Sequence, residues 1–333
     1  MKKTSRRSPF FYVGDKYNLL PEINRYFPKK IIRFIEPFTG GGSVFLNVKA
    51  EEYLLNDIDK DIISLHKFLV ESSRNRKEFF DNVLNLMKEY GLSRSYCENI
   101  VPLDLKRKWK KTYYARFNKT AYTKLKNDYN SKNPKSLLKL YLLLIYGFNR
   151  ILRFNSKGEF NLPVGNVDFN DNVVKAINGY FSWVEYKRIH ISNLDFKDFM
   201  NSISYKKDDF VYLDPPYLIS FSEYNKLWNE DKEKELLSLL DELNARGVKF
   251  AISNIIAYKG RENKIFKEWM QKYKVFKIKS NYISYYDNTK KDISEVLVVN
   301  YDKEKTGIQT LAFYYDHEKP REDEGLSHHS QGV

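Results

Sequence analysis

Four consecutive residues, Asp214-Pro215-Pro216-Tyr217, have types and a spacing that suit chemistry on the exocyclic amine of a nucleobase. Proline has a fixed φ and no N–H, so the carbonyl groups around it are held rigidly. The Asp214 carboxylate and the Pro215 carbonyl can each accept a hydrogen bond from one amine, and two acceptors at tetrahedral angles free the nitrogen lone pair for attack. Tyr217 offers a ring on which a base can stack. An incidental turn after a strand explains one Asp-Pro pair, but it explains the whole tetrapeptide poorly.

A glycine-rich segment earlier in the chain has the pattern of a ligand-binding loop. The run from Ile31 to Glu36 predicts a strand, and after the glycines an apolar helix is expected. Glycines there allow a tight turn and a close approach of the backbone to a ligand. The spacing Phe38-x-Gly40-x-Gly42 differs from the dinucleotide pattern GxGxxG, and no GK[ST] follows it. Walker-type phosphate binding is therefore excluded.

A second strand is expected at Tyr53–Asn56, and Asp57 follows it directly. A carboxylate at the tip of the second strand can accept hydrogen bonds from both ribose hydroxyls of a bound nucleoside. The glycine loop alone is a weak signal. The unit of strand, loop, helix, strand and acid indicates a site for an adenosine-containing cofactor.

Composition is consistent with a polyanionic partner. The 333 residues carry a formal net charge of +14, and 16% of them are aromatic. Between Val101 and Phe160 we count 15 Lys and Arg residues and only 3 acidic residues. A basic surface with interleaved aromatic rings suits nucleic acid. An AT-rich genome would produce a similar composition, and a charge run can simply be a solvated helix face, so composition permits this partner without proving it.

Other classes of protein are disfavoured. The single cysteine, Cys97, excludes an intramolecular disulfide and a Cys-rich zinc site, and the five histidines lack metal-ligand spacing. We therefore expect no metal. The N-terminus lacks the apolar run of a signal peptide, and the longest apolar stretch, Leu140–Phe148, is too short to span a bilayer. We expect a cytoplasmic protein with no membrane partner.

Short β-branched or aromatic runs alternate with helical patterns, which predicts an α/β sheet. The expected strands are Ile31–Glu36, Tyr53–Asn56, Arg188–Ser192, Asp209–Asp214 and Val248–Ser253. A late antiparallel hairpin at the sheet edge is expected from Lys274–Lys279 and Ser294–Tyr301. Helical periodicity is strongest in Lys60–Val70, Arg76–Tyr90, Lys234–Leu243 and Asn263–Tyr273.

Together these motifs resemble the Dam-type (D12 class) S-adenosylmethionine-dependent DNA adenine-N6 methyltransferases, over about Phe11 to Tyr301. That family has the same order of cofactor loop, target-recognition insertion and catalytic tetrapeptide. The implied fold is a Rossmann-like methyltransferase sheet with helices on both faces, plus a mostly helical insertion that carries a β-hairpin. We expect a catalytic domain at residues 1–65 and 186–303, a target-recognition domain at 66–185, and a poorly ordered acidic tail at 304–333.

The resemblance also assigns cofactor residues. Residues 11–20 are similar to the family's N-terminal cofactor motif, although the family more often has Trp at Tyr12 and Gly at Asp15. The implied catalytic residues are Asp214, Pro215, Pro216 and Tyr217. The implied cofactor-binding residues are Tyr12, Lys16, Glu36, Pro37, Phe38, Gly40, Gly42, Ser43, Asp57, Ile58 and Asp214.

Residues 146–165 resemble the helix end and hairpin of family members that read sites beginning G-A-T. Arg153 is at the position implied to read guanine, where the Arg fork fits O6 and N7. Phe148 and Asn149 are the implied wedge that enters the base stack. The family more often has Tyr at position 148, and Arg150 is unusual there. A hairpin with purely structural aromatics is the alternative. The implied DNA-binding residues are Phe148, Asn149, Arg150, Arg153, Asn155, Lys157 and Pro163.

The resemblance predicts a methyltransferase that acts on N6 of a flipped adenine in double-stranded DNA, with S-adenosyl-L-methionine as cofactor. The expected site contains GAT, with GATC as the best single prediction. A restriction–modification system of a bacterium or phage is the expected setting, with a cognate endonuclease that acts on the same site without direct contact. N4-cytosine or RNA-adenine methylation stays open, and so does a non-catalytic, cofactor-sensing DNA-binding protein.

Overall fold

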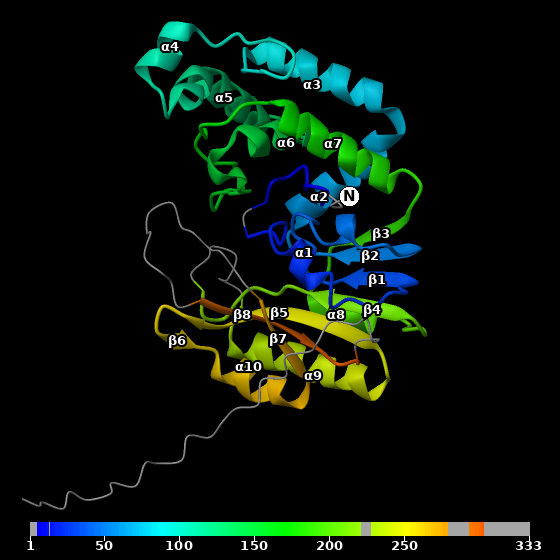
Figure 1. The fold of residues 1–333 in the computed structure, drawn as a ribbon. Helices are drawn as coiled ribbons and strands as arrows, with labels where there is room; N and C mark the ends of the chain where they lie inside the picture. The colour runs from blue at the N-terminus through cyan, green and yellow to red at the C-terminus, as the bar shows by residue number, and fades with distance from the viewer. Residues whose placement is uncertain (1–4, 13, 221–227, 279–292, 303–333) are drawn as a thin grey trace, which may run out of the picture. The chain divides into compact units, whose positions relative to one another are not determined.

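An eight-stranded sheet runs through the part of the chain that the structure describes (Figure 1). The structure is a computed structural model, and it describes residues 5–12, 14–220, 228–278 and 293–302. Seven strands lie in the order β3-β2-β1-β4-β5-β8-β7, and β6 pairs with β5. Their bounds are β1 Arg33–Glu36, β2 Glu52–Asn56, β3 Arg188–Ser192, β4 Asp209–Leu213, β5 Lys249–Tyr258, β6 Arg261–Glu262, β7 Lys274–Ile278 and β8 Ile293–Val299.

The sheet is parallel on one side and antiparallel on the other. Strands β3, β2, β1, β4 and β5 pair in parallel, whereas β8 pairs antiparallel with both β5 and β7. This confirms the expected α/β class and its late hairpin. Strand β5 continues past the predicted end at Ser253 to Tyr258, because β8 pairs with it along that stretch. Such long-range pairing leaves no mark on local periodicity.

Of the four predicted helices, α2 and α3 begin at the predicted residues and α9 begins four residues before the predicted Lys234. The helix predicted at Asn263–Tyr273 is α-helical only to Trp269, where a 3-10 turn follows. Helix α3 has the predicted bounds; the Asn75 side chain accepts from the Glu78 N–H at its start, and Gly91 ends it with φ +77°. The bounds are α1 Leu20–Ile23, α2 Lys60–Ser72, α3 Arg76–Tyr90, α4 Leu103–Lys108, α5 Tyr113–Ser131, α6 Leu137–Tyr146, α7 Asp171–Val184, α8 Phe196–Asn201, α9 Glu230–Ala245 and α10 Lys264–Trp269.

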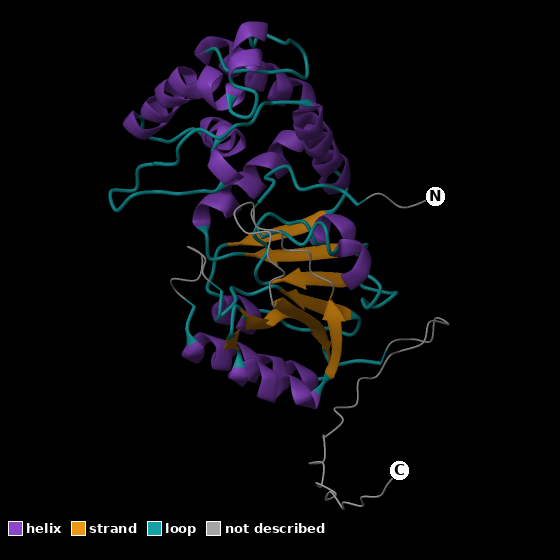
Figure 2. Ribbon diagram, turned by 60° about the vertical axis from the view of Figure 1, so that its left-hand side comes forward, coloured by secondary structure: helices purple, strands orange, loops and turns teal. Residues whose placement is uncertain are grey.

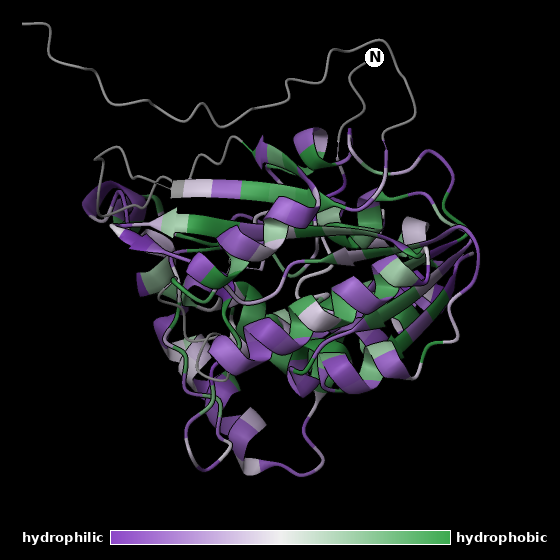
Figure 3. Cartoon of the chain, turned by 90° about the horizontal axis from the view of Figure 1, so that it is seen from below, coloured by the Kyte–Doolittle hydropathy of each residue, from purple (hydrophilic) through white to green (hydrophobic). Residues whose placement is uncertain are grey.

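Helices cover both faces of the sheet. Successive side chains of a strand point to opposite faces, so a strand that is apolar throughout has two apolar faces to bury. In β4, Phe210 and Tyr212 enter one hydrophobic core, whereas Val211 and Leu213 enter another. The first core also holds residues of α2, α3, α5, α6 and α7, and the second holds residues of α8, α9 and α10. Figure 2 shows helices on both sides of the strands, and Figure 3 shows that their ribbons carry both hydrophilic and hydrophobic residues.

The glycine loop is followed by one 3-10 turn, so the expected apolar helix at this place was wrong. Only Phe45–Asn47 is helical, and Val48 already has extended backbone angles. Side-chain bonds to the backbone replace a helical ladder here. The Asn47 amide donates to the Ser43 carbonyl at 2.8 Å, and the Tyr53 hydroxyl donates to the Val48 carbonyl at 2.8 Å. Such bonds compete with helix formation.

Helices α3 to α7 lie together on the β3 side of the sheet (Figure 1) and form the expected helical insertion. The described residues up to Asp302 belong to one compact unit, so the domain boundaries at 65 and 186 stay a prediction. The expected tail, 304–333, lies outside the described residues. None of the helices in the described ranges has the length and apolarity needed to cross a membrane.

Candidate active site

Three carboxylates meet at one edge of the sheet. Strands β2, β1 and β4 are parallel neighbours, so their carboxyl ends lie at the same edge. Glu36 ends β1, Asp57 follows β2, and Asp214 follows β4. Burial raises the pKa of Glu36 well above its usual value, and the nearby Asp214 carboxylate raises it further. This is the edge at which α/β sheets bind ligands, and its chemistry suits a positively charged one.

The glycine loop requires glycine for two reasons, its left-handed backbone angles and the close packing of neighbouring side chains against it. Gly40 has φ +47° and Gly42 has φ +73°, both in the left-handed region. A Cβ on Gly41 would lie 2.5 Å from the Tyr12 Cβ, and one on Gly42 would lie 2.3 Å from the Phe45 ring. The structure thus brings the predicted residues Tyr12, Gly40 and Gly42 together, and it adds Gly41, which the spacing argument missed.

Asp57 is tied to this loop. Its Oδ2 accepts from the Gly40 N–H at 2.8 Å, and its Oδ1 accepts from the Asp59 N–H at 3.0 Å. A carboxylate offers about four acceptor positions, so both oxygens keep capacity for a ligand hydroxyl. Burial raises the pKa of Asp57 to about 6, although the two N–H groups lower it. Ile58 beside it is 61% exposed.

Neighbouring side chains brace the start of the loop. Asn56 Nδ2 donates to the Pro37 carbonyl at 3.1 Å, and Ser8 Oγ donates to the Gly41 carbonyl at 2.5 Å. The predicted cofactor residue Ser43 donates its hydroxyl to Asp15 at 3.0 Å, which joins the loop to the N-terminal motif. Sequence reasoning missed Ser8 and Asn56. The Asn-Asp pair at the end of β2 was the available signal for Asn56, whereas no local pattern marks Ser8.

An aromatic cluster stands beside the loop. The Phe38 ring lies 5.5 Å from the Phe196 ring and 5.7 Å from the Trp228 ring, measured between centroids. Phe196 and Trp228 are 5.5 Å apart. The predicted cofactor residue Phe38 is therefore fixed by packing against α8 and the segment before α9.

The tetrapeptide forms a charged corner with the N-terminal motif and β8. Lys16 Nζ lies 2.9 Å from Asp214 Oδ1 and donates to the Tyr217 hydroxyl at 2.5 Å. Tyr217 donates to the same Asp214 Oδ1 at 2.8 Å. Behind them, Glu295 Oε1 is 3.6 Å from Lys16 Nζ. Pro215 is buried and Pro216 is half-buried.

Lys16 is buried at the centre of this corner. The resemblance implies a cofactor contact for Lys16, and the structure places its ammonium against the Asp214 carboxylate and the Tyr217 hydroxyl. Its side chain is 2% exposed, and that of Glu295 is 1% exposed. Burial raises the pKa of Glu295, and Lys16 opposes that rise. Sequence reasoning missed Glu295, because a lone acid in a late strand carries no motif.

The predicted recognition hairpin is present in the insertion. Phe154 pairs with Phe160 across it, and Gly147 pairs with Val164 at its base. Arg153 donates from Nε to Asn161 Oδ1 at 2.9 Å and from Nη2 to the Asn161 carbonyl at 3.0 Å. Its guanidinium is thereby held in one orientation.

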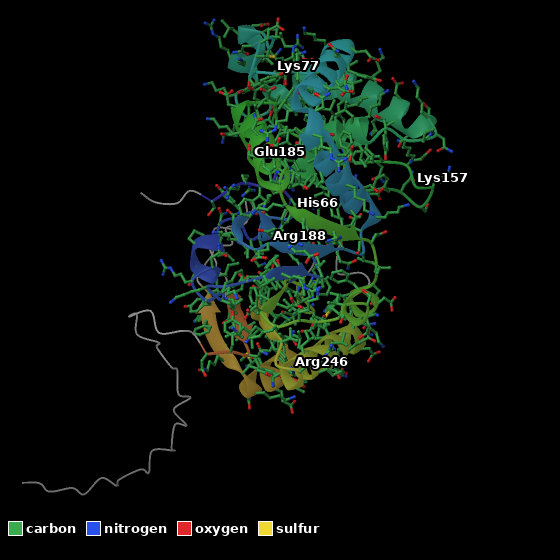
Figure 4. The ribbon with its side chains drawn as sticks, turned by 90° about the vertical axis from the view of Figure 1, so that its right-hand side faces the viewer. His66, Lys77, Lys157, Glu185, Arg188 and Arg246 are labelled. Atoms are coloured by element: carbon green, nitrogen blue, oxygen red, sulfur yellow. The ribbon has the colours of Figure 1, made fainter. Side chains whose placement is uncertain are left out.

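The predicted residues at the hairpin tip and base are largely exposed. Lys157 stands at the tip (Figure 4), and the Asn155 side chain accepts from the Lys157 N–H at 3.0 Å. At the base, the Pro163 carbonyl accepts from the Phe148 N–H at 2.9 Å. Phe148 is 46% exposed, an unusual position for a large apolar ring.

The backbone beside Phe148 is strained. Asn149 and Arg150 have φ +53° and +51°, a left-handed conformation that is costly for residues other than glycine. The Arg150 guanidinium turns inward, 4.1 Å from the Phe11 ring centroid, and its burial lowers the pKa of Arg150. The structure therefore separates Arg150, which packs on the N-terminal motif, from the exposed Phe148 and Asn149.

Helix α5 presents a basic face next to the hairpin. Its inner face is buried through Asn118, Tyr122 and Leu125. At its end, Asn130 clamps the hairpin by donating to the Phe160 carbonyl at 2.9 Å and accepting from the Phe160 N–H at 2.8 Å. Its exposed face bears Arg116, Lys119, Thr120, Thr123, Lys124 and Asn127.

Sequence comparison relates the chain to known DNA methyltransferases. The family described as D12 class N6 adenine-specific DNA methyltransferase matches residues 12–284. The chain is 33% identical to Type II methyltransferase M.FokI of Planomicrobium okeanokoites, over 89% of this chain and 43% of that protein. It is 31% identical to Modification methylase StsI of Streptococcus sanguinis, over 89% and 43%. It is 28% identical to the DNA adenine methylase of Escherichia coli K12, over 90% and 96%.

The chain thus spans less than half the length of the first two relatives and nearly all of the third. The family match covers most of the chain, from the N-terminal motif to beyond the tetrapeptide. The resemblance inferred from the motifs is confirmed: the chain belongs to the D12 class N6 adenine-specific DNA methyltransferases.

Proposed function

We propose that this protein transfers a methyl group from S-adenosylmethionine to N6 of an adenine in duplex DNA. The observation that carries the proposal is the shared sheet edge. The glycine loop follows β1 there, with Asp57 after β2 on one side of it and the Asp214 corner after β4 on the other. Donor and acceptor sites are then neighbours, as methyl transfer requires. Family membership supports the reaction class.

The residues at the edge fit this cofactor. S-adenosylmethionine supplies an electrophilic methyl group on a positively charged sulfur. Asp57 keeps acceptor capacity for ribose hydroxyls. The absence of a Cβ at Gly41 and Gly42 lets the loop backbone pack directly against Tyr12 and Phe45. Glu36 Oε2 is buried and, among the described residues, has no hydrogen-bond partner. An unsatisfied buried carboxylate oxygen favours a ligand that is cationic or carries donors.

Asp214 holds the amine to be methylated. Lys16 and Tyr217 both contact its Oδ1, so we assign Oδ2 and the Pro215 carbonyl as the two acceptors for the adenine N6 hydrogens. These bonds orient the N6 lone pair away from the ring plane for attack. Because the acceptor is a neutral amine, Asp214 need not be a strong base, and the proton can leave N6 to water after transfer. Lys16 balances the charge of Asp214.

The insertion supplies DNA recognition in this proposal. The exposed Phe148 and Asn149 enter the base stack as the adenine leaves, which costs a few kcal/mol. Arg153 has five N–H donors and uses two of them on Asn161, so Nη1 and Nη2 keep hydrogens for guanine O6 and N7. A site containing GAT follows, with GATC as the best single prediction. The basic face of α5 meets backbone phosphates.

The cellular setting is also proposed. Two relatives are named modification methylase or Type II methyltransferase, which supports a role in a restriction–modification system of a bacterium or phage. A cognate endonuclease would act on the same site without direct contact, in the cytoplasm.

An Asp214→Ala variant tests the chemistry, with Asp198→Ala on the exposed surface of α8 as its control. We expect Asp214→Ala to bind S-adenosylmethionine in calorimetry while transfer of a labelled methyl group to DNA falls by about 100-fold or more. The control should behave like wild type. Near-wild-type transfer by Asp214→Ala refutes the assignment. Cofactor and DNA binding without any methylated product from the wild type would favour a cofactor sensor.

An Arg153→Ala variant tests the recognition site, with Lys157→Ala at the hairpin tip as its control. Loss of a bidentate guanine contact should relax discrimination at that base by about 1–3 kcal/mol. Lys157→Ala should weaken binding to all sequences alike. Digestion of DNA from an expressing host with methylation-sensitive nucleases identifies the modified site. Equal weakening on all sequences by Arg153→Ala would make it a phosphate contact.

A further inference from the structure

His66 lies beneath the cofactor loop and is hydrogen-bonded through both ring nitrogens. It belongs to α2 and is 0% exposed. Its Nε2 lies 2.9 Å from the Gly40 carbonyl oxygen, and its Nδ1 lies 3.0 Å from the Tyr180 hydroxyl. Tyr180 comes from α7 and is also 0% exposed. Figure 4 shows His66 between the helices of the insertion and the sheet.

These partners fix one tautomer of the imidazole. A carbonyl oxygen can only accept, so Nε2 carries the hydrogen and donates to Gly40. Nδ1 is then unprotonated and accepts from the Tyr180 hydroxyl. Burial lowers the pKa of His66 to about 4, so the ring is neutral at physiological pH. The histidine is a fixed donor rather than a proton shuttle.

The hydrogen bonds continue through Gly40 to the cofactor carboxylate. The Gly40 N–H donates to Asp57 Oδ2 at 2.8 Å, while the Gly40 carbonyl accepts from His66 at 2.9 Å. One continuous chain therefore runs from the Tyr180 hydroxyl through His66 and Gly40 to Asp57. Gly40 has φ +47°, a left-handed conformation that glycine adopts easily because it has no Cβ. The same lack of a Cβ leaves the backbone at Gly40 free to change conformation unless other contacts restrain it. Bonds at both of its polar groups supply that restraint.

Packing leaves the imidazole little freedom to turn. The Phe10 ring lies edge-on to His66 at 4.6 Å, and the Phe45 ring lies at 5.9 Å. On the loop side, a Cβ on Gly42 would be 2.8 Å from His66 Cε1, so the ring is in direct contact with the loop backbone. Because close packing restrains the imidazole on these sides, the ring keeps one position, and the loop atoms bonded to it are held by that position.

We propose that His66 is a positioning residue of the cofactor site, which acts through Gly40 to hold Asp57 in place, and that Tyr180 sets its tautomer. This inference rests on the proposed function, because it takes the space beside Asp57 as the cofactor site. Tyr180 lies in the insertion, so an element of the DNA-recognition part completes the cofactor site. Loss of the donor to Gly40 should weaken cofactor binding without altering the methyl-transfer corner.

Calorimetric titration of the full chain with S-adenosylhomocysteine, which is unreactive, measures this effect. His66→Ala should bind about tenfold more weakly than wild type, since one buried hydrogen bond is lost. His66→Gln keeps a donor near the Nε2 position and should stay within about threefold of wild type. His190→Ala, an exposed histidine that bonds to Glu52 on β2, is the matched control and should bind as wild type does.

Steady-state kinetics separate positioning from a general structural defect. His66→Ala should raise KM for S-adenosylmethionine, while kcat at saturating cofactor stays within about twofold of wild type. Should His66→Ala fail to fold, Tyr180→Phe replaces it, with an expected loss of several-fold in affinity and the same split between KM and kcat.

Three outcomes overturn or reassign the inference. Absence of S-adenosylhomocysteine binding by wild type defeats the proposed function, and this inference falls with it because it rests on that function. Wild-type affinity in both His66→Ala and Tyr180→Phe overturns the positioning role. Equal weakening in His66→Gln and His66→Ala overturns the donor role of Nε2.

Discussion

Replacing Gly42 by alanine should damage the protein in two separable ways. The backbone at Gly42 has φ +73°, and a left-handed conformation costs an L-residue roughly 1–2 kcal/mol. In addition, the new Cβ would lie 2.3 Å from Phe45 Cε1 and 2.8 Å from His66 Cε1. Both rings are buried, and overpacking a dense core costs typically about 1–3 kcal/mol. We expect Gly42→Ala to lose about 2–5 kcal/mol of unfolding free energy.

Gly91→Ala is the matched control. Gly91 has φ +77° at the end of α3, nearly the angle of Gly42, but no described atom lies within 4 Å of the point that a Cβ on it would occupy. Its loss should be about 1–2 kcal/mol, the conformational cost alone. Urea unfolding without cofactor gives both values, and titration with S-adenosylhomocysteine gives the affinities. Gly42→Ala should also bind the cofactor product more weakly, whereas Gly91→Ala should not.

The comparison isolates the packing contribution. Equal destabilisation by the two variants would mean that Phe45 and His66 do not confine the loop. Wild-type affinity for S-adenosylhomocysteine in a folded Gly42→Ala protein would mean that loop geometry does not determine cofactor binding. Either result would refute the reasoning about the glycine loop.

Further outcomes are expected at three positions, Lys16, Asp57 and Asn130. Lys16→Met should cost about 3–5 kcal/mol of unfolding free energy, because it leaves the buried Glu295 carboxylate without its ion-pair partner. Adding Glu295→Gln should restore part of that stability. A loss below about 1 kcal/mol would contradict a buried ion pair. Cofactor affinity should fall as pH drops through about 6, because protonated Asp57 loses an acceptor, and Asp57→Asn should flatten that profile in calorimetry. The same raised pKa stabilises the cofactor-free fold below pH 3.8, and this contribution is lost as pH rises through about 6, so affinity and stability respond in opposite senses. Asn130→Ala should speed hydrogen exchange in residues 153–161 without changing cofactor affinity, since it unclamps the hairpin at Phe160; unchanged exchange would dismiss the clamp.

Local patterns predicted much of the fold. The strand at Arg188–Ser192 and the helix at Arg76–Tyr90 have the predicted bounds, because each is specified by its own periodicity and end residues. The apolar helix after the glycines was wrong, because side-chain bonds from Asn47 and Tyr53 to the backbone replaced helical ones. The extension of β5 depended on pairing with β8, which no local window contains.

The candidate site was predictable where one motif contains the chemistry, as at the tetrapeptide and the glycine loop. It was not predictable where the contact joins distant segments. Lys16 meets Tyr217 across 201 positions, and His66 meets Tyr180 across 114. From the sequence, a histidine on the apolar side of a helix is interpreted as a core residue, and its hydrogen-bond partners are not predicted. Its partners emerge only when the insertion packs against α2.

The strand order also bears on synthesis of the chain by the ribosome. Strand β1 sits between β2 and β4, and β2 sits between β1 and β3, so the earliest two strands need partners made after the whole insertion. A nascent chain that has not yet reached Leu213 exposes an unpaired edge of β1, a known hazard for aggregation. Nucleation of the sheet therefore waits for long-range closure and should be slow. Truncated products that stop within the insertion should therefore aggregate more readily than the full chain.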